Sequence, residues 1–181
     1  DPEEPKREMA ISKKSRQVRK ELKTDPENLD LQLELATLMI DGANYEEAIK
    51  QLKTVRNKAP KNPRVYKLLG TAYVLFNHEE EALIEMNRAS ELDPNDAENH
   101  FNLGGLYLLR DMFTSAADSF ERVIEIDPTD TTAYANLAAA YDMLKLYDKE
   151  IMALRKVLMF NPEDKELRSA LSNAYFHAER Y

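Results

Sequence analysis

The sequence predicts an all-α fold in which a unit of two helices repeats every 34 residues. Five of the eight prolines are separated by 34 residues each, without an insertion, and they are Pro26, Pro60, Pro94, Pro128 and Pro162. Between these prolines, apolar residues recur at i, i+3, i+4 and i+7, which is the spacing of an amphipathic helix. The composition agrees, because 43% hydrophobic and 32% charged residues are typical of exposed helices and four glycines leave little room for the turns of an all-β fold.

Each of the five prolines marks the end of one helix and the start of the next. Proline cannot continue a helix interior, because it lacks the backbone N–H and its ring clashes with the preceding turn. An Asn or Asp follows two residues later and can cap the next helix by accepting a hydrogen bond from a free N–H. These five residues are Asn28, Asn62, Asp96, Asp130 and Asp164. The additional Pro63 falls in a first helical turn, where proline is tolerated.

A column of small residues indicates where the two helices of a unit meet. It runs through the first helix of every unit, at Ala36, Gly70, Gly104, Ala138 and Ser172. Glycine inside a helix costs roughly 0.5 to 1 kcal/mol relative to alanine, so close packing must require the small residue. We therefore expect the paired helices to touch at this column and Leu69, Leu103 and Leu137, one position earlier, to be buried.

The pattern resembles the tetratricopeptide repeat (TPR), a 34-residue helix-turn-helix motif with an aromatic residue, Leu, Gly and Tyr followed by Ala, Phe and Pro at fixed offsets. The resemblance implies a right-handed superhelical solenoid. It places a basic N-terminal helix, either a half repeat or a cap, in residues 1–28, four repeats in 29–62, 63–96, 97–130 and 131–164, and a single helix in 165–181. Residues 97–130 match the motif best. Glu150 departs from it, since the same column holds Ala48, Ala82 and Ala116.

The two ends are interpreted as incomplete repeats. Val18 shares its column with Phe120, so residues 8–24 resemble a second helix that either caps the first repeat or acts as a basic arm that docks elsewhere. Residues 165–181 supply a cap or the first helix of a fifth repeat. Tyr181 falls in the column of Tyr45, Phe113 and Tyr147, where the second helix of a repeat begins. We therefore expect the parent protein to continue beyond this residue.

Charge and hydropathy exclude several classes of partner. The formal net charge is −8, although residues 1–24 hold eight Lys or Arg against five Asp or Glu. An acidic body argues against nucleic acid, which requires a basic face. No apolar run approaches the roughly 18 residues of a membrane span, so direct membrane insertion is not expected. A soluble protein without cysteine suits reducing and oxidising compartments alike; the cytoplasm is favoured, and the periplasm or export stays open.

No set of residues is expected to carry a reaction. The absence of cysteine excludes thiolate zinc sites and cysteine nucleophiles. His78, His100 and His177 are not paired at the spacing of metal ligands. The pair Gly104-Gly105 lies inside a predicted helix and not in a phosphate-binding loop. The sequence therefore predicts neither an enzyme nor a metal or cofactor site.

The TPR resemblance also implies where a ligand binds, because the first helix of each repeat lines a concave groove in that family. The residues that it assigns to peptide binding are Arg64, Lys67, Thr71, Val74, Phe101, Asn102, Gly105, Leu108, Ala135, Asn136, Ala139 and Asp142. Apolar neighbours of Gly105 form either the floor of an anchor pocket or part of the core. Asn102 and Asn136 share a column, and their amides can pair with the N–H and C=O of an extended peptide.

The predicted function is a protein-interaction scaffold or adaptor that binds a peptide or helix of another protein in the concave groove. Two alternatives stay open. One is a structural scaffold that self-assembles into a homo-oligomer through the basic N-terminal segment, and the other is a regulatory segment of a larger protein.

Overall fold

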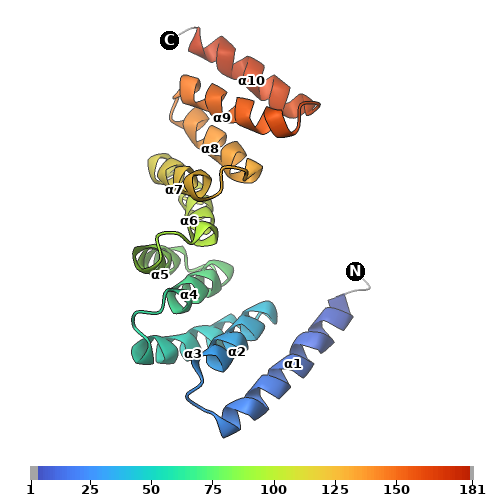
Figure 1. Cartoon of the computed structure of the whole chain (residues 1–181), viewed down its shortest axis with the longest axis vertical. Coiled ribbons are helices and arrows are strands. Elements are labelled where there is room, and N and C mark those ends of the chain that lie inside the picture. The colour runs from blue at the N-terminus through green and yellow to red at the C-terminus, as the bar shows by residue number, and fades with distance from the viewer. Residues whose placement is uncertain (1–3, 180–181) are drawn as a thin grey trace. The chain divides into compact units, whose positions relative to one another are not determined.

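A computed structural model describes residues 4–179, and this part of the chain forms ten α-helices without a strand (Figure 1). In chain order these are α1 (Glu4–Thr24), α2 (Leu29–Asp41), α3 (Tyr45–Lys58), α4 (Pro63–Leu75), α5 (Glu79–Leu92), α6 (Ala97–Leu109), α7 (Phe113–Ile126), α8 (Thr131–Met143), α9 (Tyr147–Phe160) and α10 (Lys165–Ala178). The prediction of an all-α chain of helix-turn-helix units is confirmed. Tyr181, on which the expected continuation of the chain rested, lies outside the described residues.

The helices form two compact units, residues 1–94 with α1 to α5 and residues 95–181 with α6 to α10. Unit 1 holds the helix pairs α2–α3 and α4–α5, and α1 packs against α2. Unit 2 holds the pairs α6–α7 and α8–α9, and α10 packs against α9. Within each unit, consecutive pairs are stacked because the second helix of one pair also packs against the first helix of the next.

The predicted caps are confirmed at the start of all five first helices. Asn28, Asn62, Asp96, Asp130 and Asp164 each accept a hydrogen bond from a backbone N–H of the first turn, at donor–acceptor distances between 2.9 and 3.1 Å. Replacing such a cap by alanine typically costs about 0.5 to 2 kcal/mol. The Asn or Asp after each regularly spaced proline therefore fixes where the next pair of helices begins.

A left-handed residue joins the two helices of every pair. Ala43, Asn77, Asp111 and Lys145 have φ between 55 and 59°. The N–H of the following residue donates to a carbonyl five residues back, as in the 2.8 Å bond from His78 N to Tyr73 O. This is the Schellman arrangement that ends a helix, here built without glycine. The link between paired helices is thereby held to three residues.

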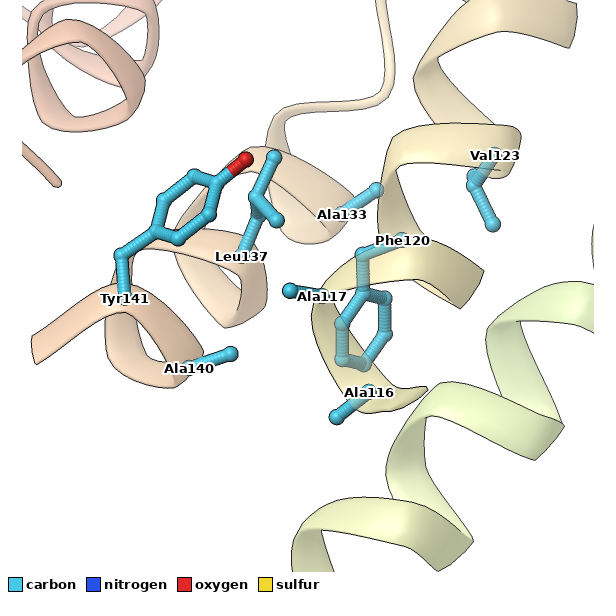
Figure 2. Packing of buried hydrophobic residues seen from close by; sticks show 8 residues of the cluster. All are labelled: Ala116, Ala117, Phe120, Val123, Ala133, Leu137, Ala140 and Tyr141. Carbon is cyan, nitrogen blue, oxygen red and sulfur yellow. The ribbon is translucent and has the colours of Figure 1, made fainter. Parts of the chain in front are cut away.

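The core lies within the helix pairs and also between consecutive pairs of the same unit. Leu69, Leu103 and Leu137 are 0, 2 and 3% exposed, which confirms their predicted burial. In unit 2, Ala117 of α7 points toward α8, whose Leu137 and Tyr141 belong to the same apolar cluster as Phe120 (Figure 2). The small column meets this core, because a Cβ added to Gly104 would lie 2.7 Å from Cζ of Phe120.

The terminal helices complete the two units. Val18 of α1 is 3% exposed, and Lys14 Nζ lies 2.9 Å from Glu34 Oε1 of α2. Ala174 is the buried residue of α10 and joins the cluster of Ile151 and Leu154 from α9. The basic N-terminal helix is thus docked on its own unit.

Candidate functional site

In unit 1, the residues assigned to the groove lie along one face of α4. Arg64, Lys67, Thr71 and Val74 follow each other at intervals of three, four and three residues, which is a single stripe on a helix. Arg64 is exposed and the other three are half-buried. The Thr71 hydroxyl donates to the Lys67 carbonyl at 3.0 Å, so it is satisfied within its own helix. This stripe offers two cationic side chains to the surface.

In unit 2, the assigned residues lie on α6 and α8, which are in contact with each other. The set on α6 is Phe101, Asn102, Gly105 and Leu108, and the set on α8 is Ala135, Asn136, Ala139 and Asp142. Gly105, Ala139 and Asp142 are exposed, and the other five are half-buried. The structure therefore brings these eight residues to the surface of two neighbouring helices. Val74 belongs to unit 1, so its expected place beside these eight residues of unit 2 stays a prediction.

Gly105 lies over open space, unlike its neighbour Gly104. A Cβ added to Gly105 would meet no atom within 4 Å. Ala139, one repeat later, is also exposed and small. Side chains of this size leave the backbone of α6 and α8 accessible, so an extended peptide can approach both helices closely.

The apolar residues beside Gly105 belong partly to the core. Phe101 packs edge-on against Phe120, with 5.6 Å between the ring centroids, and Leu108 contacts the same cluster. Both residues are therefore half-exposed on the surface and also contact the core of unit 2. A charged residue at Phe101 would disturb the fold as well as the groove, so Gly105 is the more selective position for mutation.

Two side-chain amides flank this surface. Asn102 and Asn136 are half-buried, 34 residues apart, on α6 and α8. Neither amide has a hydrogen-bond partner within residues 4–179. Each amide can both donate and accept, which matches the backbone of a peptide.

Glu150 of α9 stands where the earlier repeats have Ala48, Ala82 and Ala116, and the structure buries it. It is 7% exposed, and its Oε2 atom has no hydrogen-bond partner. Desolvation, together with the nearby charge of Asp142, raises the pKa of Glu150 to about 7. Asp142 belongs to the groove set, so a buried titratable group lies directly behind that surface.

The raised pKa predicts that protonation of Glu150 stabilises the fold. The native state keeps this proton up to about pH 7, whereas the unfolded chain loses it near the ordinary value of 4.5. The free energy of unfolding therefore falls as pH rises between these values. Such a shift represents on the order of 3 kcal/mol.

Glu150→Gln keeps the size of the side chain and removes the charge. We expect the variant to be more stable than the wild type at pH 8 and close to it at pH 5, as measured by urea unfolding at both pH values. Taking the difference between the two proteins cancels the titration of other carboxyl groups. A difference that is the same at both pH values would contradict the prediction.

Within the described residues, no group of three or more His, Asp or Glu side chains is arranged to hold a metal ion. Residues 4–179 also contain no helix that is long and apolar enough to cross a bilayer. The features that stand out on α6 and α8 are the small exposed residues Gly105 and Ala139, the amides of Asn102 and Asn136, and the exposed carboxylate of Asp142. Side chains of these kinds can contact a polypeptide backbone by hydrogen bonding and apolar packing.

Comparison with known proteins agrees with the fold. Three models described as tetratricopeptide repeat match residues 18–72, 80–131 and 119–152. The crystal structure of MamA is 25% identical with a TM-score of 0.77, covering 90% of this chain and 94% of MamA. YrrB, described as a TPR protein with an unusual peptide-binding site, is 24% identical with a TM-score of 0.70, covering 95% and 84%. A thermophilic TPR protein of Thermus thermophilus is 21% identical with a TM-score of 0.65, covering 92% and 91%.

No curated protein sequence matched the chain. The family models nevertheless extend over most of it, and they agree with the 34-residue period, the capped first helices and the small column. The chain belongs to the tetratricopeptide-repeat family.

Proposed function

We propose that the chain is a protein-interaction scaffold, and that the exposed face of its first helices binds a peptide or helix of a partner protein. The observation that carries the proposal is the surface of α6 and α8 in unit 2. There, Gly105 and Ala139 leave the helices uncovered, and the amides of Asn102 and Asn136 stand beside them. Apolar contact from Phe101 and Leu108 supplies an anchor, and the amides recognise the backbone.

The charges around this surface favour a particular ligand. Asp142 of unit 2 is exposed, as is Glu98 at the start of α6. A peptide with an apolar anchor between basic residues complements such a surface. Affinity is expected to come mainly from the anchor and selectivity from the charges, because exposed charge pairs are largely screened at physiological salt.

The proposal is tested with peptides selected from a random library displayed on phage against the intact chain. We expect Gly105→Leu to weaken the selected peptides at least about tenfold, because the new side chain occupies the space above α6. Thr114→Leu, which adds the same side chain at an exposed position of α7, is the matched control and should leave affinity unchanged. Raising the salt concentration should reduce affinity only modestly.

Binding that survives Gly105→Leu but is lost at high salt would place the ligand on the acidic outer surface and overturn the proposal.

The two alternative functions have their own tests. The molecular mass in solution decides whether the chain forms a homo-oligomer, with the helix α1 deleted as the comparison. The full-length reading frame decides whether the chain regulates a larger protein.

A further inference from the structure

A concave surface lies on α8 between the second helices α7 and α9 of unit 2. We call this surface the outer groove. Its floor is Leu137, Tyr134 and Tyr141 of α8, and its walls are Ile124 of α7 and Met152 and Ala153 of α9. It encloses about 390 Å³, which lies within the usual range of ligand pockets. None of these wall residues belongs to the face that carries Gly105.

Comparison with unit 1 explains why the outer groove is open. The residues two repeats before Ile124 and Ala153 are Arg56 of α3 and Glu85 of α5. Their side chains form an ion pair with 2.5 Å between Arg56 Nη1 and Glu85 Oε1, and Glu85 is 7% exposed. In unit 1 this pair occupies the space between the two second helices. Ile124 and Ala153 are apolar and Ala153 is short, so the corresponding space in unit 2 stays empty and apolar.

The charges on the rim leave one cation available. Glu121 of α7 accepts a hydrogen bond from the Tyr141 hydroxyl, and Lys149 Nζ lies 3.7 Å from Glu121 Oε1. Glu125, the second acid of this rim, is paired with Arg122 at 2.7 Å. Lys156 of α9 is exposed and forms no ion pair within residues 4–179. Lys156 can therefore bind an anionic group at the edge of the outer groove formed by α9.

The apolar surface continues beyond the outer groove along α9. Met152 is 69% exposed and Met159 is 74% exposed. These two methionines are seven residues apart, so they share one face of α9 over about 10 Å of helix. An apolar strip of this length matches the stripe that an amphipathic helix presents at i, i+3 or i+4, and i+7. A compact small molecule in the groove would leave most of the strip uncovered.

We propose that the outer groove docks an amphipathic helix of a partner protein, which seats an apolar side chain over Leu137 and places an acidic side chain against Lys156. Methionine-rich apolar surfaces suit such a role because the flexible thioether adapts to different side chains. The interaction uses second helices of the repeats, so it is independent of the peptide-binding face on the first helices. A scaffold with both surfaces holds two partners at the same time.

The probe is a synthetic helical peptide stapled through its side chains, with leucines at i, i+3 and i+7 and a glutamate next to the last leucine. A second peptide has lysine in place of the glutamate. Fluorescence anisotropy measures the affinity of each for the intact chain. Methyl NMR of the methionines locates binding, since we expect the signals of Met152 and Met159 to shift and that of the buried Met86 to stay unchanged.

Two variants test the site. Ile124→Arg with Ala153→Glu installs in unit 2 the ion pair that fills unit 1, and it should weaken the glutamate peptide roughly tenfold or more. Lys156→Glu changes an exposed residue without touching the core, and it should reverse the preference so that the lysine peptide binds more tightly. Gly105→Leu should leave both affinities unchanged, which separates this inference from the proposed function.

Equal affinity of the two peptides for the wild type would overturn the proposal, as would unchanged affinity in the Lys156→Glu variant. Methyl shifts confined to methionines outside α9 would do the same. If the double variant unfolds, as its circular dichroism would show, Lys156→Glu and the methyl map still decide the outcome.

Discussion

Gly104→Ala is expected to lower the free energy of unfolding by about 1 to 3 kcal/mol, the usual cost of overpacking a tight core. The added Cβ would lie 2.7 to 2.9 Å from three ring atoms of Phe120. That ring is fully buried and is held from another side by Phe101, so it cannot move away without disturbing the cluster. Chemical denaturation followed by circular dichroism measures the loss.

Gly105→Ala is the matched control, because it adds the same methyl group at the next position of the same helix. This methyl meets nothing within 4 Å, and replacing a helical glycine by alanine stabilises a helix by roughly 0.5 to 1 kcal/mol. The two variants should therefore change stability in opposite directions. Gly104→Ala combined with Phe120→Leu should cost less than the two single changes added together, because leucine makes room for the methyl. The same sign for both alanine variants would contradict the packing described for α6 and α7.

Leu103→Ala is expected to cost about 2 to 5 kcal/mol, the largest loss among the substitutions considered, because it removes a buried side chain and leaves a cavity. Leu103 is 2% exposed, at the centre of α6. Leu109→Ala removes the same atoms from a residue of α6 that is 67% exposed, and it should change stability little. The melting temperatures of both variants, measured side by side, check the prediction. Equal temperatures would mean that the assigned faces of α6 are wrong.

Much of the fold follows from local chemistry that the sequence displays directly. Proline stops a helix, and the Asn or Asp two residues later starts the next one, so Asn28 and its four equivalents act at the predicted places. The turns inside each helix pair were harder to recognise. Left-handed residues are usually glycine, whereas Ala43 and Lys145 adopt this conformation with a side chain. The bonds from Asn44 N to Met39 O and from Leu146 N to Tyr141 O hold these turns, and residue type alone gives no sign of them.

The candidate site could be predicted only in part, for a similar reason. The resemblance to the tetratricopeptide repeat assigns Gly105 to the surface face of α6, where the structure exposes it, but the resemblance does not show that Phe101 is shared with the core. Glu150 shares its column with three alanines, but glutamate is normally exposed, so neither observation alone predicts that its side chain is only 7% exposed. The outer groove exists because Ala153 stands where unit 1 has Glu85. A short side chain leaves an empty space only if no neighbouring side chain fills it, and the sequence alone does not identify the neighbours.

The small column also determines which parts of this chain are interchangeable. Where the column holds glycine, the partner helix supplies a bulky side chain, as with Gly70 and Met86 or Gly104 and Phe120. Where it holds alanine, at Ala36 and Ala138, the corresponding partners are leucines, Leu52 and Leu154. A hybrid that paired α6 with α9 would place Gly104 opposite Leu154 and leave a void. A hybrid that paired α8 with α7 would place Ala138 opposite Phe120, and the alanine Cβ would clash with the ring. Recombination between repeats, in evolution or in engineering, is therefore expected to succeed when whole helix pairs are exchanged and to fail when single helices are.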